Sequence, residues 1–453
     1  MNTSLSNKYN VPAPRYTSYP TVPYWDTTCF TPNAWSKTVI NAIKDSKGGE
    51  GISLYIHLPF CESLCTYCGC NTRITKNHKV EEPYIKAVLQ EWQMYLDIIG
   101  EAPVIRELHL GGGTPTFFSA ANLQLLIQGI LNHAVTHRDA AFSFEGHPGN
   151  TTQAHLEMLY QLGFKRLSLG IQDFDPRVQL IINRIQTVEE VEHTTTIARQ
   201  TGYHSINYDL IYGLPLQTLE GLQETVAEVI RLNPDRIAFY SYAHVPWVKP
   251  GQRRYTEKDL PDAALKQRLY ETGRQMLKAA GYEEIGMDHF TLKSDSLYLA
   301  AQEGKLHRNF MGYTDQYSSL MIGLGVSSIS DSWAGFAQNE KKVETYLELI
   351  NQGQLPVFKG HLSNAEDLIL RQHILNIMCK GFTTWDQSDE CCRAFFEGLK
   401  RMEGLEADGL VAIGETSLQV TETGKRYLRN ICMTLDARLW ENQPKTQLFS
   451  MAG

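Results

Sequence analysis

The sequence predicts an α/β fold in which repeated βα units surround a parallel sheet that is closed into a full or partial barrel. From residue 52 onward, short β-branched or aromatic runs alternate with helix-length amphipathic segments, as repeated βα units do. The chain has 453 residues, of which 42% are hydrophobic and 20% charged. That length and composition are typical of a globular protein with a large catalytic domain and accessory parts.

The predicted strands and helices alternate strictly between residues 53 and 241. The strands are expected at 53–58, 105–110, 141–145, 166–171, 205–210 and 236–241, and the helices at 81–99, 119–135, 151–161, 187–201 and 217–231. Six such units predict a partial (β/α)6 barrel, with its extension, over residues 51–360. The reactive residues of a barrel lie at the C-terminal ends of its strands.

Two further segments flank this barrel. Within residues 1–50, the stretch 11–25 (VPAPRYTSYPTVPYW) holds four prolines and three tyrosines, which predicts an ordered arm lying on the barrel rather than a disordered leader. Residues 361–453 predict a mostly helical domain with helices at 364–379 and 390–403. Two short strands and a final helix follow within 408–431, an arrangement that resembles a winged helix.

Charge and hydropathy exclude several classes of protein. The formal net charge is −8, and residues 361–453 carry 13 acidic against 10 basic side chains, so we expect neither a nucleic-acid partner nor a DNA-binding role for the winged-helix-like domain. No stretch of about 18 uncharged apolar residues occurs, and residues 1–10 lack the apolar core of a signal peptide. These features predict a cytoplasmic protein without a membrane partner.

Four of the nine cysteines lie within ten residues, directly after the first predicted strand. In a chain without an export signal, such clustering indicates metal binding before disulfides. The spacing of Cys61, Cys65 and Cys68 lets a short loop place three thiolates on one face of a [4Fe-4S] cluster and leaves one iron open. A zinc site is the rival interpretation, but no matching Cys or His pair occurs nearby. A role for Cys70 as a fourth ligand would close the open iron, so we expect Cys70 to act elsewhere in the site.

The CxxxCxxC motif after a first strand resembles the radical S-adenosylmethionine superfamily, in which the open iron chelates S-adenosylmethionine and a reduced cluster cleaves it to a 5'-deoxyadenosyl radical. The run Gly111-Gly112-Gly113-Thr114 after the second strand is similar to the segment that binds the cofactor in that superfamily, and glycines permit close backbone approach. Polar residues also follow later strands. Among them Arg184 suits a carboxylate because its planar fork binds bidentately.

A closer resemblance extends over nearly the whole chain. The segments PRYTSYPT (14–21), SLYIHLPFC (53–61), CGCN (68–71), GGGTPT (111–116), LGIQDFD (169–175), DLIYGLP (209–215), GMDHF (286–290), LHRNFMGYT (306–314) and RNICM (429–433) resemble the oxygen-independent coproporphyrinogen III oxidases, also called coproporphyrinogen dehydrogenases. This resemblance implies oxidative decarboxylation of two propionates of coproporphyrinogen III, giving protoporphyrinogen IX in anaerobic haem biosynthesis. It also implies two S-adenosylmethionine molecules, a low-potential flavodoxin- or ferredoxin-like electron donor and a monomer.

The resemblance also implies the site residues. Those expected to contact S-adenosylmethionine are Tyr55, Tyr67, Gly112, Gly113, Thr114, Glu145, Gln172, Arg184, Asp209, Ala243 and Ile329. We place Tyr55, His57 and Cys70 in the catalytic set, and Arg15 and Arg308 as partners of the substrate propionates. The chain departs from the family pattern at His147, where an aspartate is usual, and after Gln316, where acidic residues are expected.

Three alternatives stay open at this point. The first is a haem chaperone of the same superfamily, although Cys70 and the PRYTSYP arm favour the enzyme. The second is a radical methylase or haem-cleaving relative with another substrate, which His147 keeps open. The third is a winged-helix regulator that senses through its cluster, which would need a basic face that the sequence lacks.

Overall fold

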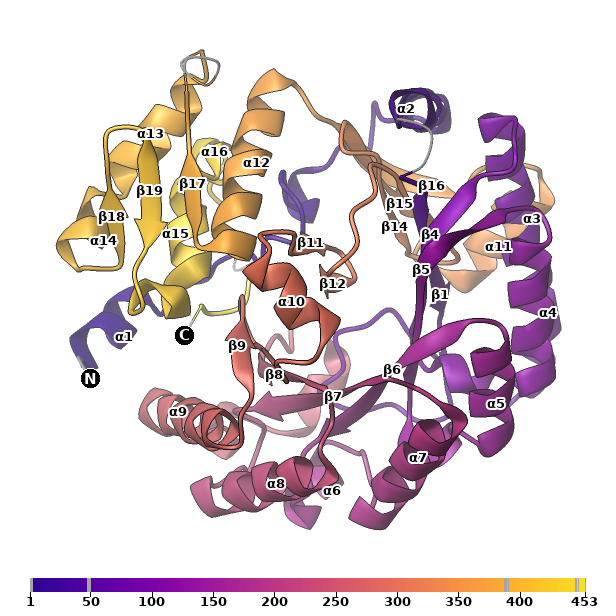
Figure 1. The fold of residues 1–453 in the computed structure, drawn as a ribbon, viewed down its shortest axis with the longest axis horizontal. Helices are drawn as coiled ribbons and strands as arrows, with labels where there is room; N and C mark the ends of the chain where they lie inside the picture. Colours follow the sequence, from indigo (N-terminus) through magenta and orange to yellow (C-terminus); the bar gives the residue numbers. More distant parts are fainter. Residues whose placement is uncertain are drawn as a thin grey trace.

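A computed structural model describes residues 3–46, 50–386, 389, 391–444, 446 and 448–452. Figure 1 shows a strongly curved sheet with helices on its outer side and a separate C-terminal group of helices beside it. The large sheet is formed by β1 (Ile52–Leu58), β4 (Val104–Gly112), β5 (Val135–Gly146), β6 (Phe164–Gln172), β7 (Ser205–Tyr212), β8 (Arg236–Ser241), β9 (Glu283–Ile285), β10 (His289–Thr291), β13 (Met321–Leu324), β14 (Ile329–Asp331), β15 (Gly335–Asn339) and β16 (Val357–Leu362).

The strand order explains why the barrel is only partial. The order is β16-β15-β14-β13-β1-β4-β5-β6-β7-β8-β10-β9, and all neighbours from β13 to β8 are parallel. β1 and β8 do not pair with each other, because β1 pairs with β13 and β8 pairs with the antiparallel strand β10. The predicted partial barrel of six βα units is therefore confirmed, and antiparallel strands extend it at both edges.

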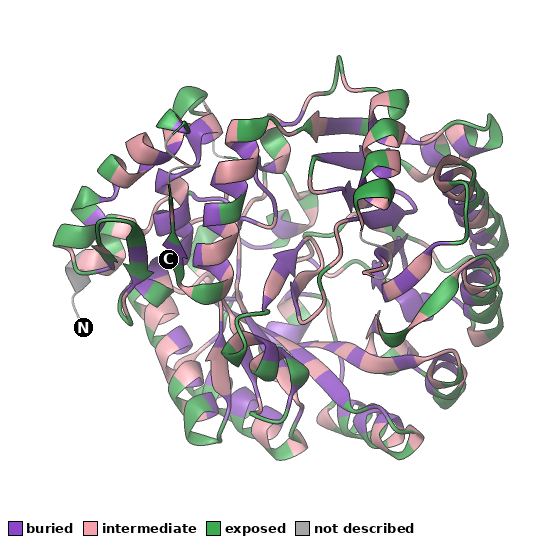
Figure 2. Ribbon diagram, turned by 45° about the horizontal axis from the view of Figure 1, so that its top comes forward, coloured by how far each residue is buried: buried purple, intermediate pink, exposed green. Residues whose placement is uncertain are grey.

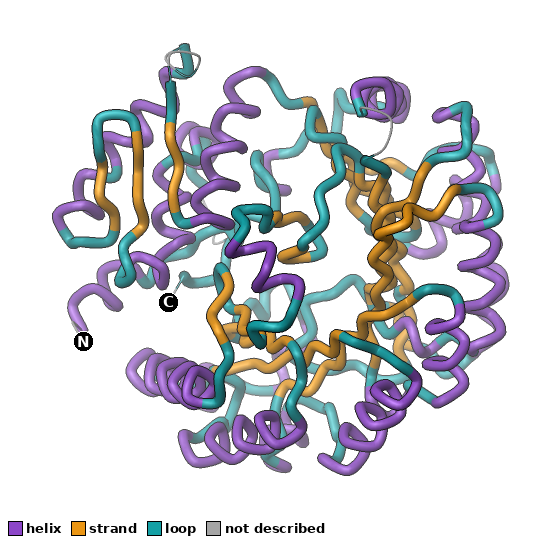
Figure 3. The backbone as a smooth tube through the Cα atoms, in the orientation of Figure 1, coloured by secondary structure: helices purple, strands orange, loops and turns teal. Residues whose placement is uncertain are grey.

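The barrel helices cover the convex face of the sheet. They are α3 (Glu81–Ile99), α4 (Ala120–Leu131), α5 (Gln153–Gln161), α7 (Val188–Thr201) and α8 (Leu219–Leu232). Figure 3 shows these helices outside and the strands inside. Side-chain caps fix where several of them begin: Thr187 and Glu190 form a capping box at α7, and Thr218 accepts from the amide of Gly221 at α8.

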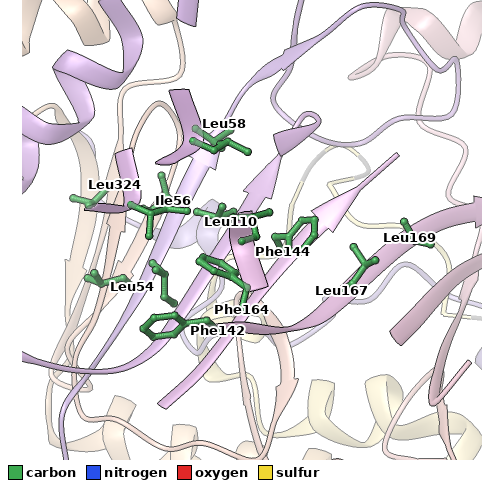
Figure 4. Close-up of a cluster of buried hydrophobic side chains, with 14 of the residues drawn as sticks. Leu54, Ile56, Leu58, Leu110, Phe142, Phe144, Phe164, Leu167, Leu169 and Leu324 are labelled. Carbon is green, nitrogen blue, oxygen red and sulfur yellow. The ribbon is translucent and has the colours of Figure 1, made fainter. Parts of the chain in front are cut away.

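The main core lies between the strands and these helices. Leu54, Ile56 and Leu58 of β1 are fully buried in it, and Figure 4 shows them beside apolar residues of the neighbouring strands. Because side chains alternate along a strand, Tyr55 and His57 face the opposite, interior side of the barrel. Burial follows the same layers: the strands are mostly buried and the outer helices expose their solvent faces (Figure 2).

The remaining elements surround this frame. They are α1 (Thr3–Tyr9), α2 (Pro32–Asp45), β2 (Phe60–Cys61), β3 (Arg73–Ile74), α6 (Pro176–Ile181), α9 (Ala263–Ala279), α10 (Ser296–Gln302), β11 (His307–Asn309), β12 (Gly312–Thr314), α11 (Val343–Asn351), α12 (Ala365–Lys380), β17 (Phe382–Thr384), α13 (Arg393–Arg401), α14 (Glu403–Ala407), β18 (Val411–Ile413), β19 (Ser417–Val420), α15 (Leu428–Thr434) and α16 (Ala437–Glu441). Among the described residues, no helix is long and apolar enough to cross a membrane.

The C-terminal region has its own apolar core, which also takes in part of the arm. Tyr16 and Tyr19 are buried among residues of α12, α13 and α15. The arm is thus ordered and lies between this region and the barrel, and Asp26, directly after the arm, pairs with Gly360 of β16. The two strands predicted within 408–431 are β18 and β19, and β17, which the sequence did not predict, pairs with β19 in the same small sheet. The predicted helix start at residue 390 lies outside the described residues.

One predicted boundary is wrong. The helix expected over 119–135 ends at Leu131, and β5 begins at Val135 instead of residue 141. The first half of β5 is largely exposed and polar, so it lacks the apolar alternation by which a buried strand is predicted.

Candidate active site

The cysteine loop follows β1 and is fastened to two neighbouring segments. The Thr66 amide donates to the carbonyl of Ile182 (2.9 Å), and the Asn183 side-chain amide donates to the carbonyl of Leu64 (2.8 Å). On the other side, the Gln252 side-chain amide donates to the carbonyl of Tyr67 (3.3 Å). The loop conformation is therefore set by the segment after α6 and by the segment after β8.

Cys61, Cys65 and Cys68 line one cavity of about 310 Å³ at the C-terminal ends of the strands. Hydrogen bonding from Cys70 lowers the pKa of the Cys68 thiol to about 6, which favours the thiolate form that binds metals. Within the described ranges, no group of three Cys, His, Asp or Glu side chains converges tightly enough to chelate a single metal ion. The three thiols that line this cavity are the ligand type that iron-sulfur clusters use.

The glycine run after β4 forms a second wall of this cavity. Gly112 has φ +121°, and a Cβ on Gly113 would lie 2.6 Å from the carbonyl oxygen of Pro59. The Gly113 amide donates to the carbonyl of Leu58 (2.8 Å), and the Thr114 amide donates to that of Phe60 (3.1 Å). Only glycine fits where this turn crosses the end of β1, and the crossing leaves backbone exposed to a ligand.

Glu145 stands at the end of β5 with its carboxylate half exposed to the cavity. It accepts from the Gly112 amide (3.3 Å), and its Oε1 lies 3.4 Å from Nε2 of His109. The His109 ring stacks on Tyr55 at 5.9 Å between centroids. These contacts hold a carboxylate at the cavity wall and leave it free to accept hydrogen bonds from a ligand.

Arg184 reaches the cavity from the segment after α6. One of its terminal nitrogens donates to the carbonyl of Gly170 (2.5 Å) and the other lies 3.7 Å from Sγ of Cys65. Its Nε is buried and has no hydrogen-bond partner. Gln172 lines the same wall with φ +67°, an uncommon conformation for a residue with a side chain. An orphaned guanidinium nitrogen in a cavity wall fits a site that receives an anionic or polar ligand.

Asp209 lies on β7 and lines the cavity beside Arg184. Its carboxylate accepts from the hydroxyl of Ser168 (3.1 Å) and the side-chain amide of Asn207 (2.9 Å). Burial raises the pKa of Asp209 to about 6. Glu145 and Asp209 therefore give a cavity dominated by carboxylates on one side and by Arg184 on the other.

Tyr55 and His57 form a hydrogen-bonded pair on the inner face of β1. Nε2 of His57 lies 2.8 Å from the carbonyl of Asn71, and since a carbonyl only accepts, this nitrogen carries the proton. Nδ1 of His57 then accepts from the hydroxyl of Tyr55 at 3.0 Å. Burial lowers the pKa of His57, which keeps the ring neutral. The pair fixes Asn71, at the end of the cysteine loop, to β1.

Most, but not all, of the residues predicted to contact S-adenosylmethionine line this cavity. Tyr67, Gly112, Gly113, Thr114, Glu145, Gln172, Arg184, Asp209 and Cys70 line it, whereas Tyr55, His57, Ala243 and Ile329 do not. The Ala243 carbonyl accepts from Gln252 (3.1 Å), and Ile329 lies on β14 beyond β13.

The two predicted substrate arginines meet each other behind the cavity. Arg15 of the arm lies 3.6 Å from the carboxylate of Asp288, and Arg308 donates to the carbonyl of Arg15 (3.5 Å). Arg308 also lies over the ring of Tyr313 at 4.5 Å, and its buried Nε has no partner. Tyr240, which Arg15 approaches to 5.7 Å, lines both the main cavity and a neighbouring interior cavity of about 160 Å³.

Sequence reasoning missed several lining residues, namely His109, Ser168 and Tyr240. The sequence did contain a signal for two of them, because side chains two residues apart on a strand face the same side. His109 lies two residues before Gly111, and Ser168 lies two residues before Gly170, so each shares the inner face of its strand with a residue of the site. His147, noted above as a departure from the family pattern, also lines the cavity, and burial with the nearby Arg184 lowers its pKa to about 3.

Comparison with known proteins first defines the class. Residues 55–229, which hold the cysteine loop and β1 to α8, match the family model described as the radical SAM superfamily. The geometry above is that of this class: a three-thiol loop after the first strand of a partial parallel barrel and a glycine turn after the next barrel strand.

The particular family follows from relatives of full length. The chain is 37% identical to the oxygen-independent coproporphyrinogen III oxidase of Pseudomonas aeruginosa, over 96% of this chain and 95% of that one, and 36% identical to that of Escherichia coli, over 99% and 97%. The solved structure of the Escherichia coli coproporphyrinogen III oxidase HemN, a radical SAM enzyme, superimposes with a TM-score of 0.88 at 36% identity, covering 94% of this chain and 98% of that one. The protein belongs to the oxygen-independent coproporphyrinogen III oxidase family.

Proposed function

We propose that this protein converts coproporphyrinogen III to protoporphyrinogen IX by radical SAM oxidative decarboxylation, in anaerobic haem biosynthesis. The observation that carries the proposal is the cavity that Cys61, Cys65 and Cys68 share with the glycine turn and Arg184, in a chain of this family. Each of two propionate side chains loses one hydrogen atom from its β-carbon. The bond between the α-carbon and the carboxyl carbon then breaks and carbon dioxide leaves. One electron passes to an acceptor, and a vinyl group remains.

The three cysteines would hold a [4Fe-4S] cluster, and two S-adenosylmethionine molecules would occupy the cavity beside it. When bound and reduced, these groups supply the carbon radical that removes the hydrogen atom. The chain's own residues bind and orient: the glycine turn offers backbone, Glu145 and Asp209 accept from hydroxyl or ammonium groups, and Arg184 with its orphaned Nε attracts a carboxylate.

The remaining site residues would act on the substrate side and around the cluster loop. The Tyr55–His57 pair keeps the end of the cysteine loop in place through Asn71. Cys70 lines the same cavity as the three cysteines and would stand outside the ligand set. Arg15 and Arg308 give positive charge behind Tyr240 and Tyr313, where propionates of a tetra-carboxylate would find partners.

The proposal includes the cellular setting. The protein would act as a cytoplasmic monomer, without nucleic acid or membrane, and would receive electrons from a low-potential flavodoxin- or ferredoxin-like donor. A radical SAM protein acting on another tetrapyrrole is a second candidate, because His147 stands in the cavity wall.

The test uses anaerobically reconstituted protein with coproporphyrinogen III, S-adenosylmethionine and dithionite. We expect protoporphyrinogen with two vinyl groups per molecule. Formation of 5'-deoxyadenosine without any vinyl product would contradict the substrate assignment and favour the second candidate. Absence of both products from protein that contains a full cluster would contradict the radical chemistry itself.

A further inference from the structure

Two exposed apolar side chains lie on or beside the cysteine loop, and one of them, Leu64, also lines the main cavity. Leu64, between the first two cluster ligands, exposes 42% of its surface, and Ile185, which follows Arg184, exposes 64%. The two residues belong to segments that are bonded together, because Asn183 donates to the carbonyl of Leu64. Large apolar side chains that cluster at the surface mark interaction sites more often than single ones do.

A second segment continues this apolar surface on the other side of the loop. Trp247 and Val248 expose 51% and 59%. Their segment contacts the loop directly: the Lys249 ammonium donates to the carbonyl of Cys70 (3.1 Å), and a Cβ on Gly251 would lie 3.4 Å from both the side chain of Leu64 and the carbonyl oxygen of Thr66. The exposed tryptophan and valine therefore lie close to the proposed cluster although they are far from it in sequence.

The charge around the loop is opposite to that of the whole chain. Residues 61–80 carry Arg73, Lys76 and Lys79 against Glu62, a net charge of +2, whereas the whole chain carries −8. Of these, Arg73 pairs with Glu344 at 2.8 Å, and Glu62 lies 3.7 Å from His78.

The segment after β8 is also basic. Residues 244–258 carry Lys249, Arg253, Arg254 and Lys258 against Glu257, which gives +3. Arg253 and Arg254 lie in the short 3-10 helix Pro250–Arg254 and are exposed. A basic margin around an apolar centre is the surface that an acidic protein partner complements.

We propose that this surface, formed by Leu64, Ile185, Trp247, Val248, Arg253 and Arg254, is the docking site for an acidic, low-potential one-electron carrier protein that reduces the cluster. The inference rests on the proposed function, which requires a reductant. In each encounter the carrier loses one electron and the oxidised cluster gains it, with no bond made or broken. Docking here places the carrier over the loop that bears the ligands, and electron transfer between proteins needs such a short path.

The test separates docking from chemistry by using two reductants. Two variants, Trp247→Ala and the double variant Arg253→Glu/Arg254→Glu, change the surface without touching the residues of the proposed cavity. A matched control, Arg138→Glu, reverses a charge on the exposed first half of β5, where Arg138 pairs with Asp139. Cluster reduction is followed by stopped-flow absorbance with no tetrapyrrole present, first with dithionite and then with a reduced acidic flavodoxin over a range of concentrations and salt.

We expect the dithionite rate to be the same in every variant. With flavodoxin, the second-order rate should fall about tenfold or more in the double variant and lose most of its salt dependence, because rim charges act mainly on association. Trp247→Ala should weaken docking with the salt dependence intact, and Arg138→Glu should match the wild type. Unchanged flavodoxin rates in both surface variants, or equal losses with dithionite and flavodoxin, would overturn the docking site. Because no substrate is present, failure of the proposed decarboxylation would leave this result readable.

Discussion

Replacing Gly113 by alanine tests the role of the glycine turn most sharply. The added Cβ would lie 2.6 Å from the carbonyl oxygen of Pro59 and 2.9 Å from that of Phe60, whereas ordinary contact begins at 3.4 Å. The backbone must therefore separate by about 0.8 Å, the difference between 3.4 and 2.6 Å, since neither atom can rotate away. Overpacking of this kind costs about 1–3 kcal/mol.

Displacement of this backbone also displaces residues of the site. The Thr114 amide bonds to the carbonyl of Phe60, the residue directly before Cys61, so the shift reaches both the glycine turn and the first cluster ligand. A misplacement of about 1 Å in a site can cost about a hundredfold in rate. We expect kcat/KM for S-adenosylmethionine to fall roughly 10- to 100-fold, while the midpoint of thermal unfolding falls by only a few degrees.

The assay is 5'-deoxyadenosine formation at varied S-adenosylmethionine concentration, with thermal unfolding by circular dichroism beside it. The control is Gly404→Ala in α14, where an added Cβ meets nothing within 4 Å. Full activity in Gly113→Ala at normal stability would refute the reasoning that this turn forms part of the cofactor site.

Three further predictions follow from the same structure. Cys61→Ser, Cys65→Ser and Cys68→Ser should each remove the cluster by iron analysis while Cys70→Ser keeps it; iron loss in Cys70→Ser would contradict its place outside the ligand set. Arg184→Lys should raise KM for S-adenosylmethionine about tenfold, because an ammonium cannot replace the guanidinium fork, and an unchanged KM would count against its carboxylate role. Burial raises the pKa of Glu91 to about 7 from 4.5, so the native state binds more protons between these values, and stability should fall by about 3 kcal/mol as pH rises from 4.5 to 7. Urea unfolding of Glu91→Gln should lack this decline relative to wild type, and parallel pH profiles would exclude Glu91 as its source.

The sequence predicted the parts of the fold whose pattern is local. Strands such as β1 and β7 are buried, rich in β-branched or aromatic residues and followed by helix signals, so their positions were predictable. The strands β13 to β16 were not predicted, because they are only three to six residues long and therefore carry too little of the strand pattern. The arm was predicted to be ordered, but its burial against the C-terminal core depends on contacts across about 400 residues.

The features of the site also divide into those that are local in sequence, which were predicted, and those that depend on contacts between distant residues, which were not. The cysteine loop and the glycine turn are each continuous in sequence, so the loop was found from its spacing and the turn from its resemblance to the cofactor-binding segment of the superfamily. The contact of Arg15 with Asp288, and the packing of the Trp247 segment on the cysteine loop, join residues far apart in the chain and required the structure. Inner-face residues such as His109 follow from strand alternation once the strand and its direction are known.

The central claim is that the site removes a hydrogen atom from the propionate β-carbon of coproporphyrinogen III. Substrate deuterated at that carbon tests it directly, with mass spectrometry of the 5'-deoxyadenosine formed. The account predicts one deuterium in each 5'-deoxyadenosine, two such molecules for each protoporphyrinogen, and a vinyl group at each propionate that has lost carbon dioxide. Unlabelled 5'-deoxyadenosine formed together with vinyl product would contradict it.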